Sequence, residues 1–185
     1  HRCFLKKKIC PYVNGGSAPR GRILDTNGKV LVDNIGVKTI YYNKIKDITT
    51  AKEIEIAYTL ANILSIEQGS VTEQKTLWLK ENNNGNDLIT NEEYRLFDER
   101  KITQEEINNL KYERITSEML NEKNESFKKA ARIYSLMNNG YAYSKKEILK
   151  NVQEEEYAQV IESNIPGVTG ELSWERIYLY EDTLK

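Results

Sequence analysis

The sequence has 185 residues, of which 39% are hydrophobic and 30% are charged, and its 27 Lys and Arg residues nearly balance 28 Asp and Glu residues for a net charge of −1. This composition indicates a globular protein with a real core, and the balanced charge gives no electrostatic basis for binding nucleic acid. No stretch approaches the roughly 18 apolar residues of a membrane span. The single histidine, His1, excludes Ser-His-Asp and Cys-His catalytic arrangements and a His-based metal site.

Residues 1–19 are predicted to be a leader or tether. The chain begins with His rather than Met, so we expect an excised fragment. Cys3 and Cys10 both lie in this segment, where a disulfide and two free thiols remain equally open. Two cysteines cannot supply a four-ligand zinc site, and we expect neither a metal nor a cofactor.

From Gly21 to about Asn43 the pattern predicts strands. Asn27-Gly28 stands between two short apolar runs and predicts a type I′ hairpin turn, because both central positions of that turn need a positive φ. The run Val37–Tyr42 is rich in β-branched and aromatic residues, which favour a strand.

After Lys46 the apolar residues repeat at helical spacing. Four segments have the form of a capping box, in which a Ser or Thr caps the helix and a Glu three residues later reaches back to it. These segments are Thr50–Glu53, Thr90–Glu93, Thr103–Glu106 and Ser144–Glu147. Behind the first of them Ile54, Ala57, Ala61 and Leu64 form one predicted helix face.

Three further segments complete the helical region. A second helix is predicted around Thr72 to Lys80, followed by an asparagine-rich loop (81–87) that we expect to bury nothing and that lacks the spaced carboxylates of a calcium loop. The longest predicted helix runs from Ser117 to Met137, with a core face made of Phe127, Ala130, Ala131, Tyr134 and Met137. Glu154–Glu156 is predicted to be a solvated helix face.

After Pro166-Gly167 the period changes to two. Leu172, Trp174, Arg176, Tyr178 and Tyr180 alternate with the residues between them, which predicts one long strand. The order of strands, helices and strand predicts an α+β fold, in which the terminal segments meet in a small antiparallel sheet. We expect residues 20–48 and 164–185 to form this sheet and residues 49–163 to form a mainly helical inserted lobe.

Two motifs at the ends resemble a known family. The segment Arg20-Gly21-Arg22-Ile23-Leu24-Asp25-Thr26-Asn27-Gly28-Lys29-Val30-Leu31 resembles the R-G-x-I-x-D-x-x-G-x-x-L signature that opens the extracytoplasmic part of class B penicillin-binding proteins. Pro166-Gly167-Val168, followed by Glu175 to Tyr180, resembles the "PGV…R-x-Y-P-Y-G" element that closes the same non-catalytic pedestal module. Leu179 replaces the usual proline and Glu181 the usual glycine. The resemblance covers about residues 20–185, and Gram-positive members often carry a helical insertion between the two motifs.

The resemblance implies the pedestal, or dimerisation, domain of a single-pass membrane protein. Such a protein has an N-terminal anchor, this module on the extracytoplasmic face of the membrane, and a C-terminal serine D,D-transpeptidase domain that cross-links peptidoglycan. The implied partners are the protein's own transpeptidase domain, membrane-embedded proteins of cell-wall synthesis or division, and a second copy in a homodimer. The motif residues expected to act structurally or in interactions are Arg20, Gly21, Asp25, Gly28, Arg176 and Tyr178.

The transpeptidase motifs themselves are missing. That chemistry needs S-x-x-K, S-x-N and K-[ST]-G, and the sequence contains only Ser126-Phe127-Lys128-Lys129, within a predicted helix. We therefore predict a non-catalytic module with no catalytic residue. The rival hypotheses are an active serine acyltransferase that uses Ser126 and Lys129, and a free-standing helical adaptor whose terminal strands do not pair.

The arginines and aromatic residues of the end motifs have structural and functional interpretations. Arg20 and Arg176 are predicted to pair with carboxylates such as Asp25 or Glu175, with partner binding as the alternative. Trp174 and Tyr178 are predicted to pack in the core, with a docking patch as the alternative. If they do, Arg176 enters the same face, and we expect an acidic side chain or carbonyl groups of the Arg20–Asn27 hairpin to hold it.

Overall fold

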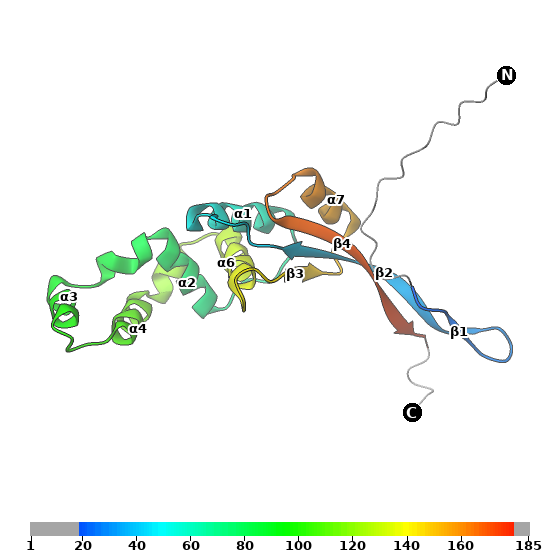
Figure 1. Cartoon of the computed structure of the whole chain (residues 1–185), viewed down its shortest axis with the longest axis horizontal. Helices are drawn as coiled ribbons and strands as arrows, with labels where there is room; N and C mark the ends of the chain where they lie inside the picture. The colour runs from blue at the N-terminus through cyan, green and yellow to red at the C-terminus, as the bar shows by residue number, and fades with distance from the viewer. Residues whose placement is uncertain (1–18, 180–185) are drawn as a thin grey trace, which may run out of the picture.

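The computed structural model of the chain describes residues 19–179 (Figure 1). The predicted leader with Cys3 and Cys10, and also Tyr180 and Glu181, lie outside these residues. In chain order the elements are β1 (Ile23–Leu24), β2 (Val30–Tyr42), α1 (Thr50–Ile63), α2 (Val71–Glu81), the 3₁₀ helix η1 (Asn83–Leu88), α3 (Asn91–Asp98), α4 (Gln104–Arg114), α5 (Ser117–Asn121), α6 (Glu125–Asn138), β3 (Lys146–Lys150), α7 (Glu154–Glu162) and β4 (Val168–Tyr178).

The strands form one antiparallel sheet around β2. β4 pairs with β2 along its length, from Val32 opposite Tyr178 to Tyr42 opposite Val168. β1 pairs with the beginning of β2 and β3 with its end. The predicted pairing of the two terminal segments and the α+β fold are therefore confirmed, and the adaptor hypothesis, which required unpaired terminal strands, is wrong.

β3 is a strand that the sequence pattern did not predict. Ser144–Glu147 has the form of a capping box but begins no helix, because the following backbone pairs with β2 and Ile148 is buried. The Ser144 hydroxyl instead donates to the Tyr141 carbonyl (2.9 Å) and accepts from the Lys146 ammonium (2.7 Å). The inserted segment thus contributes a strand to the sheet, while the division at residues 49 and 163 stays a prediction.

Most predicted helix starts agree with the structure. Thr90–Glu93 and Thr103–Glu106 form capping boxes, and Ser70–Glu73 forms a third that was not predicted. The box at Thr50–Glu53 is wrong by one residue, because Thr49 is the N-cap and accepts from the Lys52 amide. The Glu53 carboxylate is buried instead, where it accepts from the Tyr42 hydroxyl (3.3 Å) and pairs with Lys44 (2.9 Å).

A buried core joins the end of the sheet around Ile40 and Tyr42 to helices α1 and α6. Ile40 and Tyr42 of the sheet belong to the same buried cluster as Leu60 and Phe127. Burial, together with the nearby Glu53 carboxylate, raises the pKa of Tyr42 to about 12. The predicted core face Phe127, Ala130, Ala131, Tyr134 and Met137 is buried as expected.

The predicted long helix from Ser117 to Met137 is wrong. α5 ends at Asn121, and a separate helix α6 begins at Glu125. The Asn124 side chain accepts from the Phe127 amide (2.9 Å) and acts as the N-cap of α6. Asparagine is one of the preferred N-cap residues, so a new helix begins after Asn124.

The asparagine-rich loop is more ordered than the sequence indicated. It contains η1, and the expectation that it buries nothing is wrong because Gly85 is buried. Asn83, Asn84 and Gly85 all have a positive φ, of 48°, 54° and 67°. A Cβ at Gly85 would meet Leu79 Cδ2 of α2, and the left-handed φ of this position also favours glycine.

The molecule is elongated (Figure 1). Helices α2, α3 and α4 lie toward one end, and the β1–β2 hairpin lies at the other. Between them β2 and β4 run side by side and continue beyond α7 (Figure 1). The part of the sheet between α7 and the β1–β2 hairpin is a twisted ribbon without a helical layer, and we call it the ribbon.

Candidate interaction surface

Three large apolar side chains of β4 are exposed on the ribbon. Leu172, Trp174 and Tyr178 have 42%, 39% and 49% of their surface accessible to solvent. They alternate along the strand and share one side of the sheet. We call these three side chains the apolar ribbon face.

The apolar ribbon face continues the buried face of the sheet. The pairing of β4 with β2 places these three side chains on the same side of the sheet as Ile40 and Tyr42, which are fully buried under helices. Helix α7 packs against this side at Gly170, where a Cβ would lie 2.6 Å from the Tyr157 ring. α7 also reaches Lys38, opposite Leu172, through Glu154 and Tyr157, and both strands continue beyond this point (Figure 1).

The prediction that Trp174 and Tyr178 pack in the core is therefore wrong. They lie on the core side of the sheet, but the described residues leave them substantially exposed. Gly36, opposite Trp174, leaves room for the Leu172 and Trp174 side chains, which would lie 3.3 and 3.8 Å from a Cβ at that position. The Leu172 and Trp174 side chains thus pack over the β2 backbone at Gly36 rather than against a second layer.

Arg176 ties the end of the ribbon to the N-terminal segment. Its guanidinium donates through Nη2 to the Gly21 carbonyl at 3.3 Å, as expected for a carbonyl of the hairpin, although this contact is solvent-exposed. The Arg176 Nε is buried and has no hydrogen-bond partner among the described residues. The predicted carboxylate partner Glu175 pairs with Lys150 on the opposite side of the sheet instead.

Asp25 and Gly28 shape the hairpin turn. The Asp25 carboxylate accepts from the amides of Asn27 and Lys29, both at 2.8 Å, so it stabilises its own turn rather than pairing with Arg20. Only Gly28 has a positive φ in this turn, at 80°, and its amide donates to the Asp25 carbonyl. The type I′ prediction is wrong: the loop has three residues between Asp25 and Lys29, and the left-handed position falls on glycine alone.

An ion pair that the sequence did not reveal fixes the neighbouring segment. Arg22 Nε donates to the Asp33 carboxylate at 2.7 Å across the β1–β2 hairpin. The Asn34 amide and Arg22 both donate to this carboxylate and lower the pKa of Asp33. The Asn34 side chain donates in turn to the Arg20 carbonyl (2.6 Å).

These contacts border a small hollow beside the apolar ribbon face. It has a volume of about 260 Å³, and its walls include Arg20, Arg22, Asn34 and Trp174. The hollow brings Arg20 and Trp174 together from opposite ends of the sequence. Residues of the two terminal segments therefore line one hollow.

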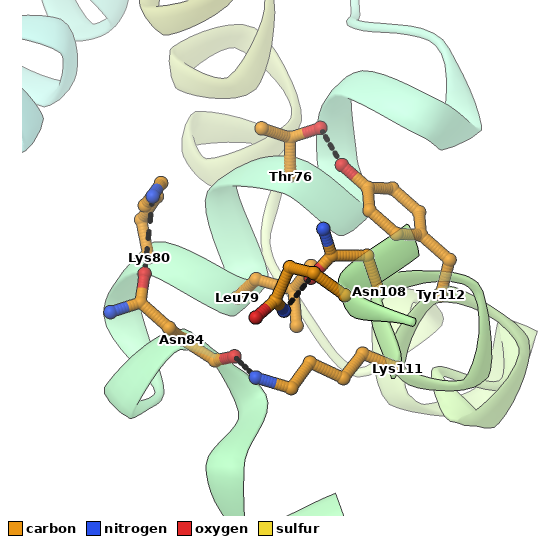
Figure 2. Close-up of a pocket in the computed structure, with 8 residues that line it drawn as sticks. Thr76, Leu79, Lys80, Asn84, Asn108, Lys111 and Tyr112 are labelled. Carbon is orange, nitrogen blue, oxygen red and sulfur yellow. Dashed lines mark hydrogen bonds between the residues drawn. The ribbon is translucent and has the colours of Figure 1, made fainter. Parts of the chain in front are cut away.

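The helical end of the molecule carries a second cavity, with a volume of about 360 Å³ (Figure 2). It lies between α2, η1 and α4, and we call it the amide pocket. Lys80 of α2 and Lys111 of α4 approach Asn84 of η1 from two sides. Thr76 and Tyr112 close another wall through a hydrogen bond of 2.8 Å between their hydroxyl groups.

The rival catalytic pair does not form a site. The Ser126 hydroxyl donates to Asn62 Oδ1 at 2.6 Å, and the Lys129 ammonium pairs with Glu125 at 3.2 Å. Activation of a serine by lysine needs the two side chains within hydrogen-bond reach of each other. The structure engages each of them elsewhere.

Residues 19–179 offer neither a metal site nor a membrane-spanning helix. No cluster of three or more His, Cys, Asp or Glu side chains there could hold a metal ion. None of the helices in this range is long and apolar enough to cross a membrane.

Comparison with known proteins identifies the class of this module. Residues 16–185 match the family model for the penicillin-binding protein dimerisation domain. The chain belongs to this family, and it is the non-catalytic pedestal module of a class B penicillin-binding protein.

Individual relatives agree with this assignment. The chain is similar to penicillin-binding protein 2A of Bacillus subtilis (strain 168), with 30% identity over 175 residues that make up 91% of this chain and 24% of that protein. Its fold is similar to two structures of penicillin-binding protein 2B from Streptococcus pneumoniae. The structure from strain 5204 has a TM-score of 0.59 and 21% identity over 88% of this chain, and that from strain R6 has a TM-score of 0.57 and 24% identity over 89%. In each case the chain spans 26% of the solved chain.

Proposed function

We propose that this module positions a serine D,D-transpeptidase domain of the same polypeptide, and that the apolar ribbon face is the contact surface. The observation that carries the proposal is the exposure of Leu172, Trp174 and Tyr178 on a strand that extends beyond its helical cover. Exposed aromatic side chains grouped on a rigid element are typical of protein interfaces. The long ladder between β2 and β4 supplies that rigidity.

The remaining expectations follow from the family. The parent protein acts in peptidoglycan cross-linking, and its N-terminal anchor places the module on the extracytoplasmic face of the membrane. Cell-wall synthesis or division proteins in the membrane, and a second copy of the module, are its further partners. The two arginine-bearing end motifs and the family match support this assignment.

Hydrogen–deuterium exchange tests the contact surface directly. The isolated chain is compared with the full-length parent protein, peptide by peptide. We expect residues 172–179 to exchange more slowly in the full-length protein, because a docked domain shields the ribbon. Peptides from α4, at the far end of the molecule, serve as an internal control and should exchange equally in both.

A matched pair of variants separates docking from general effects. Trp174→Ser combined with Tyr178→Ser in the full-length protein should abolish most of the added protection. Tyr143→Ser, at an exposed tyrosine outside the ribbon, should leave it unchanged. Equal exchange of residues 172–179 in the isolated and full-length proteins would contradict the proposal.

A further inference from the structure

The amide pocket carries positive charge without a counter-charge. Its lining includes the side chains of Lys80 and Lys111 but no aspartate or glutamate. Within residues 19–179 neither of these lysines takes part in an ion pair, although many other lysines there do. The cavity is thus a concave surface of one sign, which concentrates anions.

Lys111 is the more unusual of the two lysines. Only 8% of the residue is exposed, and its ammonium donates to the Asn84 carbonyl (2.9 Å) and to Asn86 Oδ1 (2.8 Å). Both acceptors are neutral. A buried ammonium is normally paired with an opposite charge, and it has three donors, of which these contacts use two. An anion in the cavity would complete its coordination.

The remaining polar groups of the cavity offer donors as well. Asn84 Oδ1 accepts from Lys80 (3.1 Å), and Asn108 Oδ1 accepts from Gln104 (3.1 Å). Because the oxygens of these two amides are engaged by the protein, their NH₂ groups remain as donors. A bound molecule with oxygen acceptors could therefore be held at several points.

The backbone holds this arrangement in place. The left-handed residues Asn83, Asn84 and Gly85 turn the chain so that the Asn84 carbonyl meets Lys111. Close packing of Gly85 on Leu79 fixes the turn against α2. Residues in such rare conformations are maintained by their surroundings and cluster at binding sites.

We propose that the amide pocket binds the oxyanion of a small polar molecule. The ammonium groups of Lys80 and Lys111 pair with the anion, and the amide groups of Asn84 and Asn108 donate to its other oxygens. A volume of about 360 Å³ lies within the range of small-molecule sites, which is about 300–1,000 Å³. A peptide carboxylate and a phosphate ester share this chemistry.

The test is a titration of the ¹⁵N-labelled chain followed by its amide NMR spectrum, with two pairs of probes. N-acetyl-Gly-Gly is compared with its uncharged C-terminal amide, and methyl phosphate with uncharged trimethyl phosphate. We expect a charged probe to cause saturable shifts in η1 and α4, and its neutral partner to bind about tenfold more weakly or worse, because the charge-assisted hydrogen bonds are lost. The better of the two charged probes identifies the source of the oxyanion.

The variant for this test is Lys80→Gln, because Lys80 is exposed and we expect its replacement to leave the core undisturbed. It should weaken binding of the charged probe several-fold. Lys52→Gln, at an exposed lysine on α1, is the matched control and should bind like the parent. Equal binding of charged and neutral probes, or no saturable shift with either anion, would overturn the proposal. The isolated module suffices for this experiment, so its result is independent of the proposed domain contact.

Discussion

The packing of α7 on the sheet at Gly170 gives a sharp prediction. A Cβ at this position would lie 2.6 Å from Tyr157 Cε2 and 2.7 Å from Ile161 Cδ1. Carbon atoms pack best at about 3.5–4.0 Å, so in Gly170→Ala both side chains must withdraw by roughly 0.8 Å or more. Overpacking of this kind costs about 1–3 kcal/mol.

Two effects reduce the net cost. Replacing glycine with alanine lowers the entropy of the unfolded chain, which stabilises by about 0.4–1 kcal/mol. Ile161 is also nearly half exposed and can move in part. We expect Gly170→Ala to lower the free energy of unfolding by about 1–2 kcal/mol, which corresponds to a urea midpoint lower by about 0.5–1 M.

Gly36→Ala is the matched control on the same side of the same sheet. Its new Cβ would lie 3.3 Å from Leu172 Cδ1, the end of an exposed and flexible side chain. We expect its urea midpoint, measured by far-ultraviolet circular dichroism, to equal or slightly exceed that of the parent. In a Tyr157→Ala background the Gly170→Ala penalty should become smaller, because the clash with the ring is removed and only the contact with the partly exposed Ile161 side chain remains. Identical midpoints for both alanine variants, or a penalty of the same size with and without the ring, would refute the packing described here.

Two further predictions concern a carboxylate and the rival catalytic serine. Arg114, together with the Thr90 cap, lowers the pKa of Glu93 to about 2, below the ordinary value of 4.5. The stability contributed by Glu93 should therefore be fully present above about pH 4.5 and be lost as the pH falls toward 2. The gap in denaturant midpoint between the parent and Glu93→Gln should shrink over that window; a constant gap would mean that the ion pair does not stabilise the fold. Separately, a fluorescent penicillin should leave the isolated chain unlabelled, and stoichiometric acylation at Ser126 would contradict the non-catalytic assignment.

Local signals in the sequence predicted local structure well. The capping boxes at Thr90 and Thr103 and the core face around Phe127 depend on residues within one helix, so the pattern contains the necessary information. The strand β3 depends on pairing with β2, more than 100 residues earlier in the sequence. β3 has only five residues, of which the first and last are lysines, and this is too short for a clear alternation of apolar and polar residues.

The apolar ribbon face shows a different limit. Alternation along β4 correctly predicted that Leu172, Trp174 and Tyr178 share one side of the sheet. The alternation could not predict whether a second layer covers that side, because this depends on how far along the sheet α7 extends in the folded structure. The small residues Gly36 and Gly170 are the signal that could have helped, since one makes room for Trp174 and the other for Tyr157.

The amide pocket could not have been located from the sequence. Lys111 lies in a helix whose neighbouring residues are mostly polar, and a lysine there is expected to be solvated. Its burial results from the left-handed turn at Asn84 and Gly85, which brings η1 against α4. Three consecutive asparagines followed by glycine favour such turns, but the pattern does not say which side chain they meet.

The path of the chain through the sheet has a mechanical consequence. β1 and β4 both run antiparallel to β2 and flank it at the same end, and Leu179 is hydrogen-bonded to Leu31 across the ladder. Tension between residues 19 and 179 therefore passes through the hydrogen bonds of these three strands. Residues 43–167 form a loop closed by the β2–β4 pairing and carry none of this load until that pairing ruptures. The helices, with the amide pocket among them, are shielded from a pull that the ribbon must withstand.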